Sequence, residues 1–124
     1  MQTILHTLQG RSFIECLPVG ETLSSEKAAL DLVAACGENG VHHILINQNC
    51  LSPDFFDLRT GLLGIVLLKF TTYHIIAAVV VQPELSQKGK FGQFVLETNR
   101  GAQFRVFPDR EDAVNWLINN PDPY

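Results

Sequence analysis

The sequence predicts an α/β protein built on a mixed, mainly parallel sheet of about five strands, with an N-terminal β-hairpin and flanking helices. Two observations support this prediction. Short apolar runs alternate along the chain with segments of helical periodicity. One run, residues 75–81, is apolar at every position, which is typical of a central parallel strand covered on both faces. The predicted order of elements is β-β-α-β-α-β-α-β-α.

The first elements are predicted to be a hairpin and a helix. Residues 3–9 and 12–18 are short apolar runs separated by a turn at Gly10, which accepts the positive φ of a tight turn. Ser24 or Ser25 is a suitable helix N-cap, because a serine hydroxyl can accept a hydrogen bond from a free backbone N–H. The helical face that follows consists of Ala29, Leu32, Val33 and Cys36.

The middle of the chain is predicted to contain a strand and two helical segments. Residues 41–46 form the strand, and Pro53 with its neighbours marks a helix start, because proline fits the first helical position. After a break near Gly61, residues 62–70 are apolar on nearly every face. We expect this helix to be buried on more than one side, by the sheet and neighbouring helices or by a partner chain.

The last part of the chain completes the alternation. A third helical face contains Phe91, Phe94, Val95 and Thr98. Residues 103–107 alternate like a strand near an edge of the sheet, and Asp109 is placed to cap a final helix. We expect residues 1–120 to form a single α/β domain and residues 121–124 to form a flexible tail.

Composition argues against several classes of partner. The formal net charge is −4 and the nine basic residues are scattered, so a nucleic-acid partner is not expected. The longest apolar run is far shorter than the roughly 20 residues of a membrane helix. The three cysteines have no close pair, and with no recognisable targeting segment they indicate the cytoplasm. Adjacent His42 and His43 would point to opposite faces of a strand, so no metal site is predicted.

No cofactor motif or catalytic set is recognisable in the sequence. Glycine-rich nucleotide loops and the Gly-x-Ser-x-Gly elbow are absent, so we predict no cofactor and favour a binding protein over an enzyme. Ligands of open parallel sheets gather at the carboxyl ends of the strands, where Asn47, Asn49 and Cys50 are the crevice candidates. Cys50 also precedes the predicted helix start, where a helix dipole can lower a thiol pKa. The alternative for Cys50 is a buried hydrophobic side chain.

The segment of residues 55–68 carries a resemblance to known proteins. It reads Phe-Phe-Asp-Leu-Arg-Thr-Gly and continues as an aliphatic run. It resembles the loop and helix start of STAS domains, the anti-sigma-factor-antagonist fold, and the order of elements along the chain is similar to that fold. The residues around Asp57 also resemble a motif shared by a bacterial family of domains of unknown function. The resemblance to that family extends over nearly the whole chain, and the family has no established activity.

The resemblance to STAS regulators has an implication for one residue. In those regulators, a partner kinase phosphorylates the hydroxyl residue that precedes the glycine, and the phosphate disrupts partner binding. The matching position is Thr60, followed by Gly61. The residues themselves support a simpler role for Thr60, as the N-cap of the following helix.

Three functional hypotheses follow. The first is a regulatory protein-interaction module, with Thr60 as its phosphoacceptor and a partner-binding surface formed by Asp54, Phe55, Phe56, Asp57 and Arg59. Adjacent helical residues lie about 100° apart, so one of the two phenylalanines is a candidate anchor for a protein partner. The second is a small-molecule-binding protein or small enzyme that uses the strand-end crevice. The third is a homodimer that pairs through residues 62–70.

Overall fold

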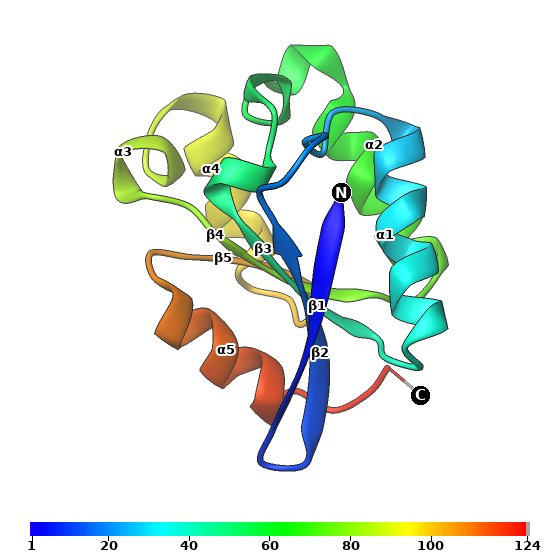
Figure 1. Ribbon diagram of the computed structural model, residues 1–124. Helices are drawn as coiled ribbons and strands as arrows, with labels where there is room; N and C mark the ends of the chain where they lie inside the picture. The colour runs from blue at the N-terminus through cyan, green and yellow to red at the C-terminus, as the bar shows by residue number, and fades with distance from the viewer. Residues whose placement is uncertain (124) are drawn as a thin grey trace.

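In the computed structural model, residues 1–123 are described, and the chain folds around one five-stranded sheet (Figure 1). The strands follow one another in the order β1 (Gln2–Leu8), β2 (Arg11–Leu17), β3 (His43–Asn47), β4 (Ile76–Val80) and β5 (Phe104–Phe107). Only β1 is antiparallel to its neighbour. The predicted mainly parallel sheet, with its N-terminal hairpin and flanking helices, is therefore confirmed.

Helices cover both faces of the sheet, in unequal numbers. The longer helices are α1 (Glu26–Glu38), α2 (Leu62–Thr72), α4 (Gly89–Thr98) and α5 (Arg110–Asn119). A short helix, α3 (Pro83–Ser86), and the 3-10 turns η1 (Gln48–Cys50), η2 (Pro53–Phe55) and η3 (Leu58–Thr60) lie in the connections. The helices α1, α2 and α4 share one hydrophobic core, whereas α5 packs on the opposite face.

This division of the helices follows from the handedness of the connections. Each β-α-β crossover is right-handed by preference, and each new parallel strand here is added on the same side of the previous one. The connecting helices α1, α2 and α4 therefore all fall on the same face. No strand follows α5 in the sheet, so the handedness of crossovers does not restrict its position. It covers the face that α1, α2 and α4 leave open.

Local signals set the starts of several elements. The hairpin turn is formed by Gln9 and Gly10, both at positive φ, as a two-residue hairpin of this type requires. Ser25 Oγ accepts a hydrogen bond from Ala28 N, and this bond caps α1 as predicted. Asp109 caps α5 in the same way, through Asp112 N at 2.8 Å.

Two predictions about the middle of the chain are corrected. The helix expected from Pro53 is only a single 3-10 turn, because Asp57 adopts an extended conformation (φ −99°, ψ 101°) and interrupts it. The helix at residues 62–70, α2, is buried on one side only. Leu68 is 60% exposed and Ile65 is 38% exposed, because α2 packs onto the sheet beside α1 and its outer face has no further layer.

Residues at the C-terminal end of the described chain contact the hairpin and the sheet. Asp122 Oδ1 lies 3.1 Å from Arg11 Nη1, and His43 Nε2 lies 2.8 Å from Asn120 O. His43 is buried, and this burial lowers its pKa. The residues up to Pro123 therefore lie against the hairpin and the sheet, while Tyr124 lies outside the described residues. Within the described part of the chain, no helix is long and apolar enough to cross a membrane.

Side chains close the free edge of β5. Asn99 Nδ2 donates to Val106 O at 3.0 Å, and Asn99 Oδ1 accepts from Val106 N at 2.8 Å. Thr98 Oγ1 donates to Phe104 O at 2.6 Å. These groups at the end of α4 take the place of a sixth strand, so this edge has few free backbone groups with which another chain could pair.

Replacing Asn99 with alanine is expected to destabilise the protein by about 1–3 kcal/mol, because Val106 is buried and would lose partners for both its N–H and its C=O. Asn119→Ala is the matched control, since its side chain makes a single exposed bond to Asn115 O. Urea denaturation of both variants measures the difference. Equal losses would contradict the role given to Asn99.

Candidate functional site

A crevice of about 700 Å³ opens at the carboxyl ends of β3, β4 and β5. Its walls include Leu51, Phe56 and Leu85, and its polar groups are carboxamides. The four carboxamide residues are Asn47, Gln48, Asn49 and Gln82. Among the described residues, those that line this crevice carry no formal charge. Carboxamides both donate and accept hydrogen bonds, so the crevice suits an uncharged polar group beside an apolar one.

The candidate crevice residues occupy different positions. Asn49 is exposed, whereas Asn47 points its Nδ2 to Glu15 Oε2 at 2.8 Å and is therefore already engaged. Cys50, the third candidate, does not line the crevice. It is buried, and its Sγ donates to Cys16 O at 3.1 Å.

The other cysteines are equally enclosed. Cys16 and Cys36 are buried, and all three thiols are free. The neighbouring Cys50 side chain and burial both raise the pKa of Cys16, and burial raises the pKa of Cys36 to about 12. The nucleophile hypothesis for Cys50 has no support in this geometry, because the side chain is not accessible to a substrate in the crevice.

One wall of the crevice is the segment of residues 53–61, which we call the 3-10 segment. Phe55 points inward and is fully buried, within ring-contact distance of Phe91 and Phe104. Phe56 is only half-buried, and its ring packs edge-on against Phe91 with centroids 5.0 Å apart. Phe55 is thus a core residue in this conformation, and only Phe56 of the pair presents part of its ring at the surface.

The charged residues of the 3-10 segment bind one another. Arg59 Nε and Nη2 each lie 3.0 Å from a carboxylate oxygen of Asp57, a bidentate pair on the surface. Hydrogen bonds from the Arg59 side chain lower the pKa of Asp57. Asp54 is exposed nearby. Arg59 is therefore a solvent-facing cation that a stronger anion could draw away from Asp57.

Thr60 lies where the 3-10 segment meets α2. Thr60 is exposed, and its Oγ1 lies 2.7 Å from Asp54 O and 2.9 Å from Asp57 O. The hydroxyl hydrogen is therefore shared between two backbone carbonyls. The same oxygen accepts from Leu62 N at 3.3 Å. The formal N-cap of α2 is Gly61, at φ +79°, and not Thr60 as predicted. Thr60 nevertheless links the carbonyls of Asp54 and Asp57 to the first N–H group of α2, that of Leu62.

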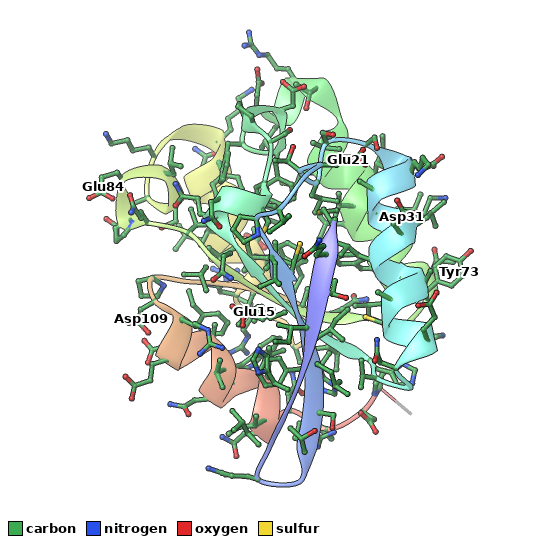
Figure 2. All side chains as sticks on the ribbon, in the orientation of Figure 1. Glu15, Glu21, Asp31, Tyr73, Glu84 and Asp109 are labelled. Carbon is green, nitrogen blue, oxygen red and sulfur yellow. The ribbon has the colours of Figure 1, made fainter. Side chains whose placement is uncertain are left out.

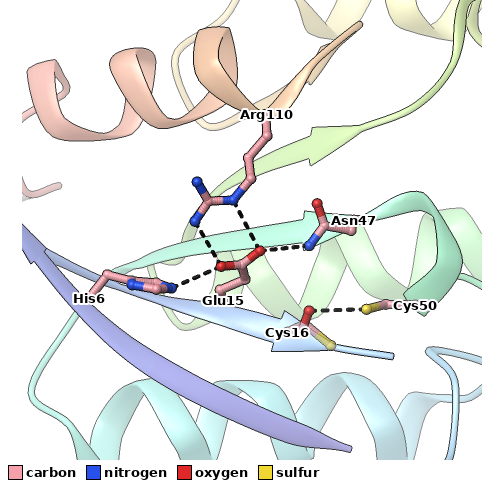
Figure 3. Close-up of polar contacts among 6 residues, drawn as sticks. All are labelled: His6, Glu15, Cys16, Asn47, Cys50 and Arg110. Atoms are coloured by element: carbon pink, nitrogen blue, oxygen red, sulfur yellow. Dashed lines mark hydrogen bonds and ion pairs between the residues drawn. The ribbon is translucent and has the colours of Figure 1, made fainter. Parts of the chain in front are cut away.

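A cluster of polar side chains around the Glu15 carboxylate lies on the other face of the sheet (Figure 3). Glu15 Oε1 lies 2.8 Å from His6 Nε2 and 2.9 Å from Arg110 Nη2. Its Oε2 accepts from Asn47, already described, and from Arg110 Nε at 3.3 Å. One carboxylate therefore joins β1, β2, β3 and the start of α5. Figure 2 shows Glu15 inside the molecule, whereas Asp31 and Glu84 lie at its periphery.

Glu15 remains ionised in this environment. Burial acts to raise its pKa, but the hydrogen bonds from Arg110, Asn47 and His6 together outweigh burial and hold the pKa at about 2. A carboxylate with such a low pKa is a poor proton acceptor near neutral pH. The Glu15 cluster therefore acts as a structural clamp beneath the crevice, and through Asn47 it fixes one of the crevice walls.

The sequence did not single out Glu15, His6 or Arg110 as a cluster. The available signal was a charged residue, Glu15, inside the apolar run of residues 12–18, which required a partner on the same sheet face. That partner, Arg110, is 95 positions away and could not be named without the packing of α5.

Comparisons with known proteins identify a family but no activity. Among curated proteins, none matches this chain at a significant level. The model of one family, described as "Domain of unknown function (DUF4180)", matches residues 8–117. The matched region runs from the end of β1 to α5 and includes both the 3-10 segment and the crevice. The chain therefore belongs to the DUF4180 family of domains of unknown function.

Proposed function

We propose that this protein is a regulatory protein-interaction module of STAS-like type, whose partner-binding surface is the 3-10 segment and whose switch is phosphorylation of Thr60. The observation that carries the proposal is the position of the Thr60 hydroxyl. It is exposed, and a single oxygen holds Asp54, Asp57 and the start of α2 together. A chemical change at that oxygen would alter all of these hydrogen bonds and so the shape of the 3-10 segment.

Phosphorylation would have a direct structural consequence at this position. The phosphorylated oxygen has no hydrogen to donate, so the carbonyls of Asp54 and Asp57 would lose their shared donor. The new negative charge would also repel Asp57 and attract Arg59, which is adjacent and exposed. The N-terminal end of α2 favours the phosphate electrostatically. The expected outcome is a rearranged 3-10 segment with Arg59 released from Asp57.

The unmodified surface offers features typical of a protein-docking site. The half-buried ring of Phe56 supplies an aromatic contact, and Asp54 and Arg59 supply exposed charges of opposite sign around it. Aromatic side chains and arginine are enriched at the energetic centres of protein interfaces. The buried core beneath, anchored by Phe55, keeps the segment in one shape before a partner arrives.

The test is affinity purification of the intact protein from its native cells, with mass spectrometry of the co-purifying proteins and of the Thr60 peptide. We expect a stoichiometric protein that is retained by Thr60→Ser and lost with Thr60→Glu, and a phosphorylated Thr60 peptide. Thr72→Glu is the matched control. Thr72 is also exposed and also donates its hydroxyl to a backbone carbonyl, Leu68 O, but it lies at the far end of α2. If nothing co-purifies and Thr60 is unmodified, the proposal is wrong.

A second candidate function is supported by the crevice itself. Its carboxamides and apolar walls suit a small, neutral, polar ligand, and its place at the carboxyl ends of parallel strands is the usual one for ligands. Fragment screening by ligand-observed NMR tests this function, with Leu85→Trp as the variant that fills the crevice. Leu96→Trp, at an exposed position of α4, is the control and should leave binding unchanged. Fragments that bind wild type and Leu85→Trp equally would contradict this function.

A further inference from the structure

The two edges of the sheet differ in whether their outward-facing backbone groups have hydrogen-bond partners. The edge at β5 is closed by Asn99 and Thr98. At the other edge, the two-residue turn makes Leu8 and Arg11 the first hydrogen-bonded pair of the hairpin, and hydrogen-bonded pairs then alternate along the register. The backbone N–H and C=O groups of Thr3, Leu5 and Thr7 consequently point away from β2. They form a free, strand-pairing edge.

The β1 edge has none of the features that usually prevent edge-to-edge pairing. Its seven residues contain no proline, lysine, arginine or acidic side chain, and the pairing with β2 is regular along its full length. Its apolar side chains are also unusually open, with Ile4 45%, Leu5 48% and Leu8 44% exposed. In Figure 1, β1 runs along the near edge of the sheet, with α1 and α5 on either side of it and neither in front.

We infer that β1 is a dimerisation edge whose partner is β1 of a second copy of this chain, paired antiparallel about Leu5. The sequence from Thr3 to Thr7, Thr-Ile-Leu-His-Thr, identifies the partner because it is nearly symmetric about its centre. In this register, Thr3 lies opposite Thr7 of the second copy and Leu5 lies opposite Leu5. These are the residues whose backbone groups face outward, so each opposed pair exchanges two hydrogen bonds.

The side chains on both faces are compatible with this register. Leu5 meets Leu5 on the α1 face, and each threonine meets a threonine, which are favourable cross-strand pairs. On the α5 face, Ile4 lies opposite His6 of the second copy, whose ring stays bonded to Glu15 of its own chain. No like charges are opposed. The two sheets then form one continuous sheet around a two-fold axis at Leu5, a closed and self-complementary interface.

Registers centred on other residues are poorer. A shift of the centre to Ile4 or to His6 moves one of the outward-facing residues beyond the end of the partner strand, and it breaks the threonine–threonine pairs. If the two β1 strands are shifted by an odd number of residues, the outward-facing backbone groups of one strand lie opposite inward-facing backbone groups of the other, and they cannot form hydrogen bonds. The Leu5-centred pairing is therefore the register that uses all of the free edge.

Sedimentation equilibrium tests the inference on the full chain, and it does not depend on the function proposed above. We expect the wild type to be dimeric at about 100 μM. Leu5→Lys and Leu5→Glu should each be monomeric, because like charges would face each other across the axis. A one-to-one mixture of these two variants should recover a dimer, since lysine then faces glutamate. Leu68→Lys, at the more exposed of the two open apolar positions of α2, is the matched control and should remain dimeric.

Each other result contradicts the inference. A monomeric wild type overturns it outright. Dissociation by Leu68→Lys in place of Leu5→Lys assigns the interface to α2. A mixture that remains monomeric overturns the Leu5-centred register. Should Leu5→Lys fail to fold, Leu5→Pro serves instead, because the N–H of Leu5 faces outward and proline is tolerated at such edge positions. A folded, dimeric Leu5→Pro would count against the pairing.

Discussion

Replacing Phe55 with alanine is expected to destabilise the protein by about 3–5 kcal/mol, the range for removing a buried aromatic side chain from a core. Phe55 is fully buried and packs against Phe56, Phe91 and Phe104 with ring centroids 5.6 to 6.5 Å apart. The cavity would open directly beneath the 3-10 segment. Urea denaturation at neutral pH, followed by circular dichroism, measures the loss.

Phe56→Ala is the matched comparison for Phe55→Ala. Phe56 is half-buried and packs mainly against Phe91, so we expect a loss of about 1–2 kcal/mol and a native circular dichroism spectrum. If Phe56 is the partner anchor, the same variant should lose the co-purifying protein while remaining folded. Equal losses of stability for the two variants would show that both rings are core residues, and the anchor role of Phe56 would be wrong.

Replacing Arg110 with alanine is expected to cost up to about 3 kcal/mol, because it leaves the buried Glu15 carboxylate without its main cationic partner. Arg110 itself is half exposed, so this loss comes from stranding Glu15 and not from the surface contact alone. Arg100→Ala is the control, since Arg100 forms only an exposed pair with Glu97. It should change stability by less than about 0.5 kcal/mol.

The same cluster predicts the pH dependence of stability. The pKa of Glu15 is about 2 in the folded protein, below its usual value of about 4.3 in an unfolded chain. The unfolded chain therefore binds more protons as pH falls, and the contribution of Glu15 is complete above about pH 4.3 and is lost progressively toward pH 2. Urea midpoints measured at pH 7, 4.5 and 3 should fall less for Glu15→Gln than for the wild type. A parallel fall in both proteins would contradict this contribution.

The secondary structure was largely accessible from the sequence because its signals are local. Ser25 and Asp109 cap their helices through residues three positions away, and the hairpin turn at Gly10 depends on a single backbone angle. The helix expected from Pro53 failed for a reason that is not local. Pro53 starts a helical turn as its chemistry demands, but Phe55 is drawn into the core and the chain turns again at Asp57. Tertiary packing overrode the local preference there.

Some features of the candidate site could be predicted from local sequence, and others depended on tertiary packing. Asn49 and the residues from Asp54 to Thr60 were named from strand ends and from a motif, and most of them lie at the surface where the motif suggested. For Cys50 the sequence left a buried side chain and a reactive thiol as alternatives, and for Phe55 and Phe56 it left open which ring points inward. Only packing decides between them, and it buries Cys50 and Phe55. The closing of one sheet edge by Asn99 was hidden for the same reason.

By itself, the sequence determined the alternation of strands and helices, the mainly parallel sheet and the antiparallel hairpin, because periodicity, caps and crossover handedness act over a few residues or follow general rules of chain geometry. Only the tertiary structure decided the sequential strand order, the face covered by α5 and the pairing of Glu15 with Arg110 across 95 positions. Such contacts depend on which surfaces meet when the chain collapses. No local pattern in the sequence encodes them.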